Sequence, residues 1–364
     1  MIKIYPNLAK KLKPIHIMIK NNHYCVILAG GIGSRFWPYS RKNKPKQFLD
    51  FFGTGHTLLQ LTFNRYNKIV PQENIFIVTN NHYKDLVKQQ LPELDESRIL
   101  LEPTRRNTAP CIAWVSSRIK QLNPNANIIV APSDHLILKE DEFAKAMIDG
   151  LQFVAEFPQL LTLGIKPSRP ETGYGYIQIT EEKEGNFYKV KTFVEKPQIE
   201  FAQIFVNSDE FYWNSGIFLW NVNTIIEAFN IHMPEICEKV MNGNEDFESC
   251  PNISIDYGIM EKADNVYAQI CDFGWADLGT WHSLHETSPK DSQKNVVING
   301  NTLLYDCQNS IVTIPKGKLA VIQGLEDYLI ADTNNVLLIC KKDDENKIRR
   351  YVNDVQVKLG DDFV

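Results

Sequence analysis

The chain has 364 residues, 43% of them hydrophobic and 23% charged, an ordinary globular composition that excludes disordered and fibrous classes. At about 150 residues per domain, this length predicts two domains, or one large domain with a smaller companion. The formal net charge of −5 provides no general attraction to nucleic acid or to an anionic membrane, so we expect neither as a partner and expect any phosphate to be bound locally.

The start of the chain and the cysteines limit where the protein works. The first twenty residues are rich in lysine and lack an apolar core, so we expect that they do not form a signal peptide. The first strand-like run begins only at Tyr24, just after Met18, so we expect residues 1–21 to be a flexible extension, with residues 1–17 either loose or upstream of the true start. Seven cysteines are scattered singly, which favours a reducing compartment, the cytoplasm, over a disulfide framework or a zinc site.

From Tyr24 to about Gly164, short apolar runs alternate with amphipathic segments, a pattern that predicts an α/β fold with a mixed, mostly parallel sheet. No apolar run approaches the ~18 residues that a membrane span needs. The predicted strands are Tyr24–Ala29, Asn74–Val78, Ile99–Leu101, Ile128–Ala131 and Leu160–Leu163.

From Gly173 onward the pattern becomes strand-rich, and one helix is predicted to begin near Val222. After about Ser292 the runs become short and β-rich, separated by Gly, Asn and Asp, and a final helical segment follows. We therefore predict a catalytic domain over residues 22–290 and a small all-β domain with a terminal helix over residues 291–364, packed directly on the first.

The strongest motif joins a buried strand to a loop with three glycines in four residues. Its glycines are Gly30, Gly31 and Gly33, followed by Ser34 and Arg35, and Lys46 lies in a Pro-Lys-Gln-Phe run shortly after. Such a loop lets backbone N–H groups surround phosphate oxygens while the basic residues add positive charge. It fits neither the dinucleotide fingerprint nor a Walker A loop. A tight turn without a ligand is the alternative.

Two carboxylates are candidates for a metal site. Asp134 follows an apolar strand, at the strand end where open α/β sheets bind ligands, although a lone Asp there is often a helix cap. Asp277 lies in a turn rich in Gly and Trp. Two carboxylates together with substrate phosphates are the usual ligands of protein-bound Mg²⁺.

A third group of motifs could bind a ring-shaped polar ligand. Gly175 lies in a Gly-Tyr-Gly-Tyr run, Glu195 and Lys196 are adjacent, and Asn214 lies in a Trp-Asn-Ser-Gly run. Glu195 and Asn214 can bind hydroxyls, and Lys196 can bind a phosphate. Taken singly, each motif is also compatible with a hairpin or a solvated ion pair.

Together and in this order, these motifs resemble the sugar-phosphate nucleotidyltransferases, most closely the bacterial mannose-1-phosphate guanylyltransferases. The resemblance also includes the Arg-Asn-Thr-Ala-Pro run that contains Asn107 and Thr108. It implies a Rossmann-like nucleotidyltransferase domain followed by a left-handed β-helix, which could pair two chains. Many relatives continue into a phosphomannose isomerase domain; this chain ends before one could fit, so we expect no isomerase activity.

The resemblance implies that GTP and α-D-mannose 1-phosphate give GDP-mannose and pyrophosphate. Gly30, Gly31, Gly33, Ser34, Asn107 and Thr108 would bind the nucleotide, and Arg35, Lys46, Asp134 and Lys196 would be catalytic. Asp134 and Asp277 would hold Mg²⁺, and Gly175, Glu195 and Asn214 would contact the sugar.

Two alternatives remain at this stage. The chain could use another pair of nucleoside triphosphate and sugar 1-phosphate, because the phosphate site is shared across the family, or it could be a regulatory protein of the same fold without turnover. One departure concerns the base pocket: Arg105 replaces a glycine that is common in relatives, and it disfavours a positive φ there.

Overall fold

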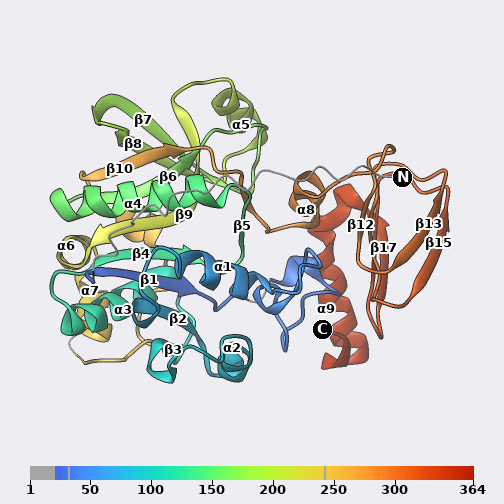
Figure 1. Cartoon of the computed structure of the whole chain (residues 1–364), viewed down its shortest axis with the longest axis horizontal. Coiled ribbons are helices and arrows are strands. Elements are labelled where there is room, and N and C mark those ends of the chain that lie inside the picture. The colour runs from blue at the N-terminus through green and yellow to red at the C-terminus, as the bar shows by residue number, and fades with distance from the viewer. Residues whose placement is uncertain (1–20, 32, 242) are drawn as a thin grey trace, which may run out of the picture.

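The computed structural model describes residues 21–31, 33–241 and 243–364. Figure 1 shows a large α/β unit with its sheet between helical layers and, beyond it, a small β unit flanked by the C-terminal helix. The predicted flexible extension, residues 1–21, lies outside the described residues except for residue 21. The prediction that residues 1–17 are loose or precede the true start also concerns residues outside that range. Within those residues, no helix is long and apolar enough to cross a membrane.

The large unit is built on a sheet of nine described strands, in the order β3-β2-β1-β4-β9-β6-β10-β8-β7. Their bounds are β1 His23–Leu28, β2 Ile75–Asn80, β3 Ile99–Glu102, β4 Asn127–Pro132, β6 Leu160–Ile165, β7 Gly175–Glu184, β8 Phe187–Glu195, β9 Phe211–Asn221 and β10 Val266–Cys271. The five strands expected between Tyr24 and Gly164 all form, with ends that differ by at most two residues.

The sheet is mixed, as predicted, but it is not mostly parallel. Among the nine described strands of this sheet, only β1–β2, β1–β4, β2–β3 and β6–β10 pair in parallel. Strand β9 lies antiparallel between β4 and β6, and the β7–β8 hairpin adds antiparallel pairings at the far edge. The strand-rich segment after Gly173 therefore enters the main sheet, and its hairpin and return strand reverse the local direction.

Alternate residues of β1 belong to two cores, one on each face of the sheet. Cys25 and Ile27 pack on one face with α1 (Leu58–Tyr66), α2 (Lys84–Gln90) and α4 (Glu140–Glu156). Tyr24 and Val26 pack on the other face with α3 (Thr108–Leu122), α6 (Val222–His232) and α7 (Pro234–Val240). This two-sided burial explains the continuous apolar runs of the central strands. Helix α5 (Ile199–Val206) covers part of β9, where Phe205 stacks on Phe211.

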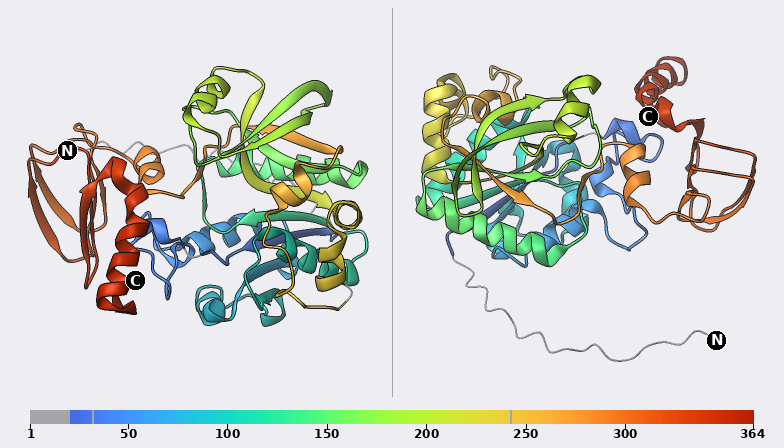
Figure 2. Two further views of the ribbon diagram at one scale, coloured as in Figure 1. Left: turned by 180° about the vertical axis from the view of Figure 1, so that it is seen from behind. Right: turned by 90° about the horizontal axis from the view of Figure 1, so that it is seen from above.

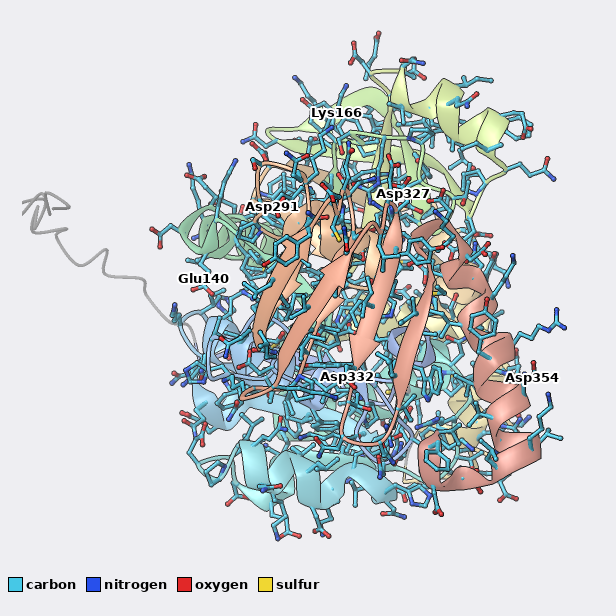
Figure 3. The ribbon with its side chains drawn as sticks, turned by 90° about the vertical axis from the view of Figure 1, so that its right-hand side faces the viewer. Glu140, Lys166, Asp291, Asp327, Asp332 and Asp354 are labelled. Carbon is cyan, nitrogen blue, oxygen red and sulfur yellow. The ribbon has the colours of Figure 1, made fainter. Side chains whose placement is uncertain are left out.

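The C-terminal unit forms the predicted short strands. They are β12 Val296–Ile298, β13 Asn301–Tyr305, β14 Ile311–Thr313, β15 Leu319–Gln323, β16 Tyr328–Asp332 and β17 Leu337–Lys341, and the terminal helix α9 spans Ile348–Leu359. Strands β12, β14 and β16 pair in parallel, β13 pairs in parallel with β15, and β17 closes the first sheet antiparallel. Figure 3 looks onto this unit, with Asp327 and Asp332 near opposite ends of β16.

The C-terminal unit packs directly on the large unit, as expected from the absence of a linker. A shared core joins Phe36, Trp37 and Trp281 to Leu329 and Ile348 of the small unit. Two further views show α9 beside the loop that follows β1 (Figure 2). The segment after the glycine loop is therefore buried between the two units.

Candidate active site

The side chains of Gln47 and Thr79 hold the backbone of the glycine loop after β1 by hydrogen bonds. The amide of Gln47 donates hydrogen bonds to the carbonyls of Ala29 and Gly31, both at 2.9 Å, and Thr79 donates to Ala29 at 3.0 Å. Gly33 has φ +64°, and a Cβ there would lie 2.7 Å from Cγ of Lys46. The loop therefore requires glycine at position 33 both for its backbone conformation and for the approach of Lys46.

Arg35 follows in η1 (Ser34–Phe36), a short turn that Ser34 begins. Its positive charge partly opposes the two carboxylates that raise the pKa of Lys46, and partly opposes the burial that raises the pKa of Glu345 in the C-terminal unit. Among the described residues, no carboxylate lies within ion-pairing distance of Arg35. The side chain is therefore available to an anion beside the loop.

Asp134 and Asp277 converge on the ammonium group of Lys46. The Lys46 Nζ lies 2.7 Å from Oδ2 of Asp134 and 3.8 Å from Oδ1 of Asp277, and it donates to the carbonyl of Leu278 at 2.8 Å. Asp134 occupies the turn between β4 and β5 (His135–Ile137) and is not a helix cap. Strand β11 (Trp275–Asp277) pairs antiparallel with β5, which sets Asp277 opposite His135.

Lys46 and Asp134 stabilise each other's charged forms. Lys46 is only 9% exposed, and burial lowers the pKa of its ammonium, but the two carboxylates outweigh burial and hold that pKa above its ordinary value. Burial likewise raises the pKa of Asp134, and the charge of Lys46 outweighs it, so the pKa of Asp134 is lowered. Asp134 therefore remains available as an anionic ligand.

The carboxylate pair fits a divalent cation that substrate phosphates help to coordinate. The ammonium group of Lys46 shows that the carboxylates of Asp134 and Asp277 can bind one positive charge between them. Within the described residues, no cluster of three or more His, Cys, Asp or Glu could hold a metal by itself. Two protein carboxylates completed by phosphate and water is the arrangement typical of Mg²⁺.

A cavity of about 380 Å³ opens beside the glycine loop. Gly30 and Gly31 line one wall, and Asn107 and Thr108 line another at the N-terminus of α3. Asn107 has φ +64° and its side chain caps the helix, while the Thr108 hydroxyl accepts from the backbone of Ile255 at 2.8 Å. The structure thus brings four of the predicted nucleotide-binding residues to one cavity.

The three predicted sugar-binding residues also lie together. Gly175 pairs with Glu195 across the β7–β8 hairpin, and a Cβ on Gly175 would lie 2.5 Å from Oε2 of Glu195 and 3.6 Å from Cβ of Asn214. Asn214 accepts from the hydroxyl of Thr162 at 2.9 Å and donates to Asp256 at 2.8 Å. The absence of a side chain at position 175 therefore lets the carboxylate of Glu195 approach the glycine beside Asn214.

Lys196 and Tyr174 border this group. Lys196 forms an ion pair with the adjacent Glu195, and its side chain is 59% exposed. The hydroxyl of Tyr174 donates to the backbone carbonyl of Asp277 at 3.3 Å. Tyr174 therefore connects the hairpin to the carboxylate pair.

Sequence reasoning missed two carboxylates, the half-buried Asp256 and the buried Glu102. Asp256, in the π-helical turn η6 (Asp256–Met260), hydrogen-bonds to Asn214; burial and the nearby Glu195 raise its pKa. Glu102, at the end of β3, lines the cavity beside the glycine loop. The only signal for Glu102 was its place after an apolar run, and for Asp256 there was none beyond its residue type.

The departure at Arg105 does not force an unusual backbone. Arg105 is not among the described residues with positive φ, whereas Asn107, two residues later, is. The Arg105 side chain reaches the Tyr83 hydroxyl at 3.4 Å, with its guanidinium 5.8 Å from the ring centroid. Arginine is therefore accommodated at this position without a positive φ.

Comparison with known proteins places this site in a family. The family model described as Nucleotidyl transferase matches residues 24–294. A mannose-1-phosphate guanylyltransferase of Escherichia coli is 36% identical over 349 residues, which cover 90% of this chain and 74% of that protein. One of Salmonella montevideo is 36% identical over 355 residues, with coverage of 92% and 74%.

A solved structure shares the architecture. The crystal structure described as mannose-1-phosphate geranyltransferase from Thermus thermophilus superimposes with a TM-score of 0.85 and 31% identity, covering 92% of this chain and 99% of that one. The chain therefore belongs to the nucleotidyl transferase family and, within it, to the bacterial mannose-1-phosphate guanylyltransferases.

Proposed function

We propose that the protein transfers GMP from GTP to α-D-mannose 1-phosphate, releasing pyrophosphate and forming GDP-mannose. The observation that carries this proposal is the convergence of Lys46, Asp134 and Asp277 beside the glycine loop. The names of the curated relatives supply the choice of nucleotide and sugar.

The reaction is a direct attack of the sugar phosphate on the α-phosphorus of GTP. A sugar phosphate is already ionised at neutral pH, so the site needs no general base and acts by alignment and charge neutralisation. In this proposal the backbone of Gly30, Gly31, Gly33 and Ser34 surrounds the phosphates. Arg35 and Lys46 stabilise the triphosphate and the departing pyrophosphate.

Asp134 and Asp277 would hold Mg²⁺. The bound ion supplies charge neutralisation at the reacting phosphates. Lys46 contacts the same two carboxylates and would add its own positive charge to the neutralisation of the phosphates. The mild overall acidity of the chain is then compatible with a polyphosphate substrate.

The mannose ring would bind beside Gly175, where the carboxylate of Glu195 and the side chain of Asn214 lie close to the glycine. Carboxylate and amide groups bind sugar hydroxyls. Lys196 would exchange its partner Glu195 for the sugar's phosphate or the α-phosphate. Asn107 and Thr108 would line the nucleotide pocket.

The test is pyrophosphate release across a matrix of nucleoside triphosphates and sugar 1-phosphates, with and without Mg²⁺. We expect GTP with mannose 1-phosphate to be the preferred pair and turnover to require the metal. Preference for UTP or a glucose phosphate would refute the substrate assignment, and no turnover with any pair would favour a regulatory protein.

The charged site is tested by Asp134→Ala and Arg35→Ala. Each removes a charge that acts mainly in the transition state, so turnover is expected to fall roughly 10²–10³-fold. Asp264→Ala, on the exposed surface, is the matched control and is expected to keep wild-type turnover. Unchanged turnover of the two site variants would overturn the proposed mechanism.

We also propose a division into domains, a fold for the C-terminal unit, a cellular compartment and an oligomeric state. The match over residues 24–294 supports a catalytic domain at 22–290 and a separate unit at 291–364. Alternating parallel strand pairing supports a left-handed β-helix there.

The free cysteines and the nucleotide substrate support a location in the cytoplasm. The apolar outer face of β13 and β15 supports a homodimer through this unit.

A further inference from the structure

The C-terminal unit contributes one carboxylate to the edge of the candidate active site. Glu345 lies in η7 (Lys342–Lys347), and its Oε2 accepts a hydrogen bond from the backbone N–H of His282 at 3.0 Å. Burial raises the pKa of Glu345, and hydrogen bonds from that N–H and from the Thr280 hydroxyl oppose the rise. Among the residues that the structure describes, this carboxylate forms no ion pair. Its close partners therefore lie at the start of α8 (Trp281–Thr287).

Both contacts fall just after Asp277, on the segment that places its carboxylate. Asp277 ends β11, and Thr280 caps α8 three residues later. Between them, the carbonyl of Leu278 accepts a hydrogen bond from Lys46 at 2.8 Å. A Cβ on Gly279 would lie 3.1 Å from Oδ2 of Asp277, so this carboxylate lies against its own turn. A shift of the turn would therefore move both the carboxylate of Asp277 and the carbonyl that Lys46 binds.

Glu345 itself is held in place by the core that joins the two units. Ile348, three residues farther along the chain, is fully buried and belongs to the same core as Trp281. Figure 1 shows α8 at the junction between the large unit and the C-terminal unit. The N–H of His282 is one of the donors at a helix start that have no partner within the helix. Glu345 supplies the missing acceptor from a fixed element of the other unit.

We propose that Glu345 is a positioning residue of the active site, which holds the turn that places Asp277 for metal binding through the backbone of His282. This inference deepens the proposed function and rests on it. Removing a group that orients a metal ligand typically costs about 10- to 100-fold in metal affinity or activity. The C-terminal unit then sets how strongly the metal stabilises bound GTP.

The test is the affinity for GTP, measured by calorimetry without sugar phosphate, first with Mg²⁺ and then with a chelator. The ratio of the two affinities isolates the contribution of the metal, and wild-type protein is expected to bind GTP more tightly with Mg²⁺. In Glu345→Ala the N–H of His282 loses its acceptor. The ratio is expected to fall about 10-fold, while the affinity in chelator stays at the wild-type value.

Glu345→Gln keeps a carbonyl that can accept from His282, so it is expected to restore the ratio to near the wild-type value. The matched control is Asp343→Ala, which removes an exposed carboxylate from the same turn and is expected to leave the ratio unchanged. Thermal unfolding verifies that each variant folds. Glu345→Asp, whose shorter side chain withdraws the carboxylate from His282, replaces the alanine variant if that variant does not fold.

A wild-type ratio in the folded alanine or aspartate variant would overturn the inference and leave the proposed function intact. An equal loss of affinity with and without the metal would also overturn it, because a merely structural role predicts that result. A reduced ratio that Glu345→Gln restores, in a protein that fails to use mannose 1-phosphate, would support the inference and refute the proposed function instead.

Discussion

Gly33 is the residue at which loop conformation and catalytic charge are most closely linked. Gly33→Ala puts an alanine at a left-handed φ of +64° and places its Cβ 2.7 Å from Cγ of Lys46. The backbone alone costs roughly 1–2 kcal/mol, and displacing Lys46 also disturbs its pairing with Asp134. We expect a loss of stability larger than that amount and a fall in turnover of about 10²-fold, measured by denaturant unfolding and pyrophosphate release.

Gly185→Ala is the control for that variant. Gly185 has φ +61° but no atom within 4 Å of its added Cβ, so it isolates the backbone cost. We expect its activity to stay near wild type. Equal losses of stability and activity in both variants would show that contact with Lys46 is unimportant.

Glu102 is expected to lower stability at neutral pH. Burial raises its pKa above the ordinary value of 4.5, outweighing Cys111 and Arg105. The folded state therefore binds this proton more tightly than the unfolded state, and ionisation destabilises the fold above the raised pKa. We expect Glu102→Gln to raise the thermal unfolding midpoint at pH 7, and the gain to vanish as pH falls below about 4.5. A lower midpoint at pH 7 would contradict this assignment.

The sequence predicts some of these residues better than others. Arg35 and Lys46 are found by their spacing from three glycines, because a phosphate loop is a local chain feature. Glu102 is not found, because its importance depends on a cavity that strands and helices far apart in the chain form together. The role of Asp256 depends likewise on contact with Asn214, 42 residues away.

At the scale of elements, the short β5–β11 pairing brings Asp134, just before β5, close to Asp277 at the end of β11. Its three-residue strands are separated by more than a hundred residues, and Trp275 donates to Nδ1 of His135 at 3.2 Å across them. Strands this short have no periodicity to detect. The C-terminal strands were predictable because Gly, Asn and Asp separate each short apolar run.

The contact between the catalytic loop and the chain end is tested by Trp37→Phe. The Trp37 indole N–H donates to the carbonyl of Phe363 at 2.7 Å. Replacing it by Phe keeps an aromatic ring and leaves the carbonyl without this donor, which is expected to cost about 1–3 kcal/mol of stability in denaturant unfolding.

Trp281→Phe provides the comparison. Trp281 lies in the same core, but its buried indole nitrogen has no hydrogen-bond partner among the described residues. We expect it to lose less stability than Trp37→Phe. The reverse order would show that ring packing, and not the bond to Phe363, joins these segments.

For the whole molecule, the outer face of β13 and β15 is the surface proposed to pair two chains. Leu303, Tyr305, Leu319 and Val321 are each about half exposed there, and adjacent exposed apolar side chains favour association. We expect a dimeric mass by light scattering, and a monomer for the double variant Leu303→Glu with Val321→Glu. Gln323→Glu, at the edge of the same face, is the control. A monomeric wild-type protein would refute this prediction.

The most direct test of the central claim is pyrophosphate release from GTP and mannose 1-phosphate by the full-length protein, with Mg²⁺ present and then removed by chelation. We expect turnover that requires both substrates and the metal, that is highest for this pair, and that falls roughly 10²–10³-fold in Asp134→Ala. Turnover that survives chelation and the loss of Asp134 would contradict the account, as would a stronger preference for another nucleotide and sugar phosphate.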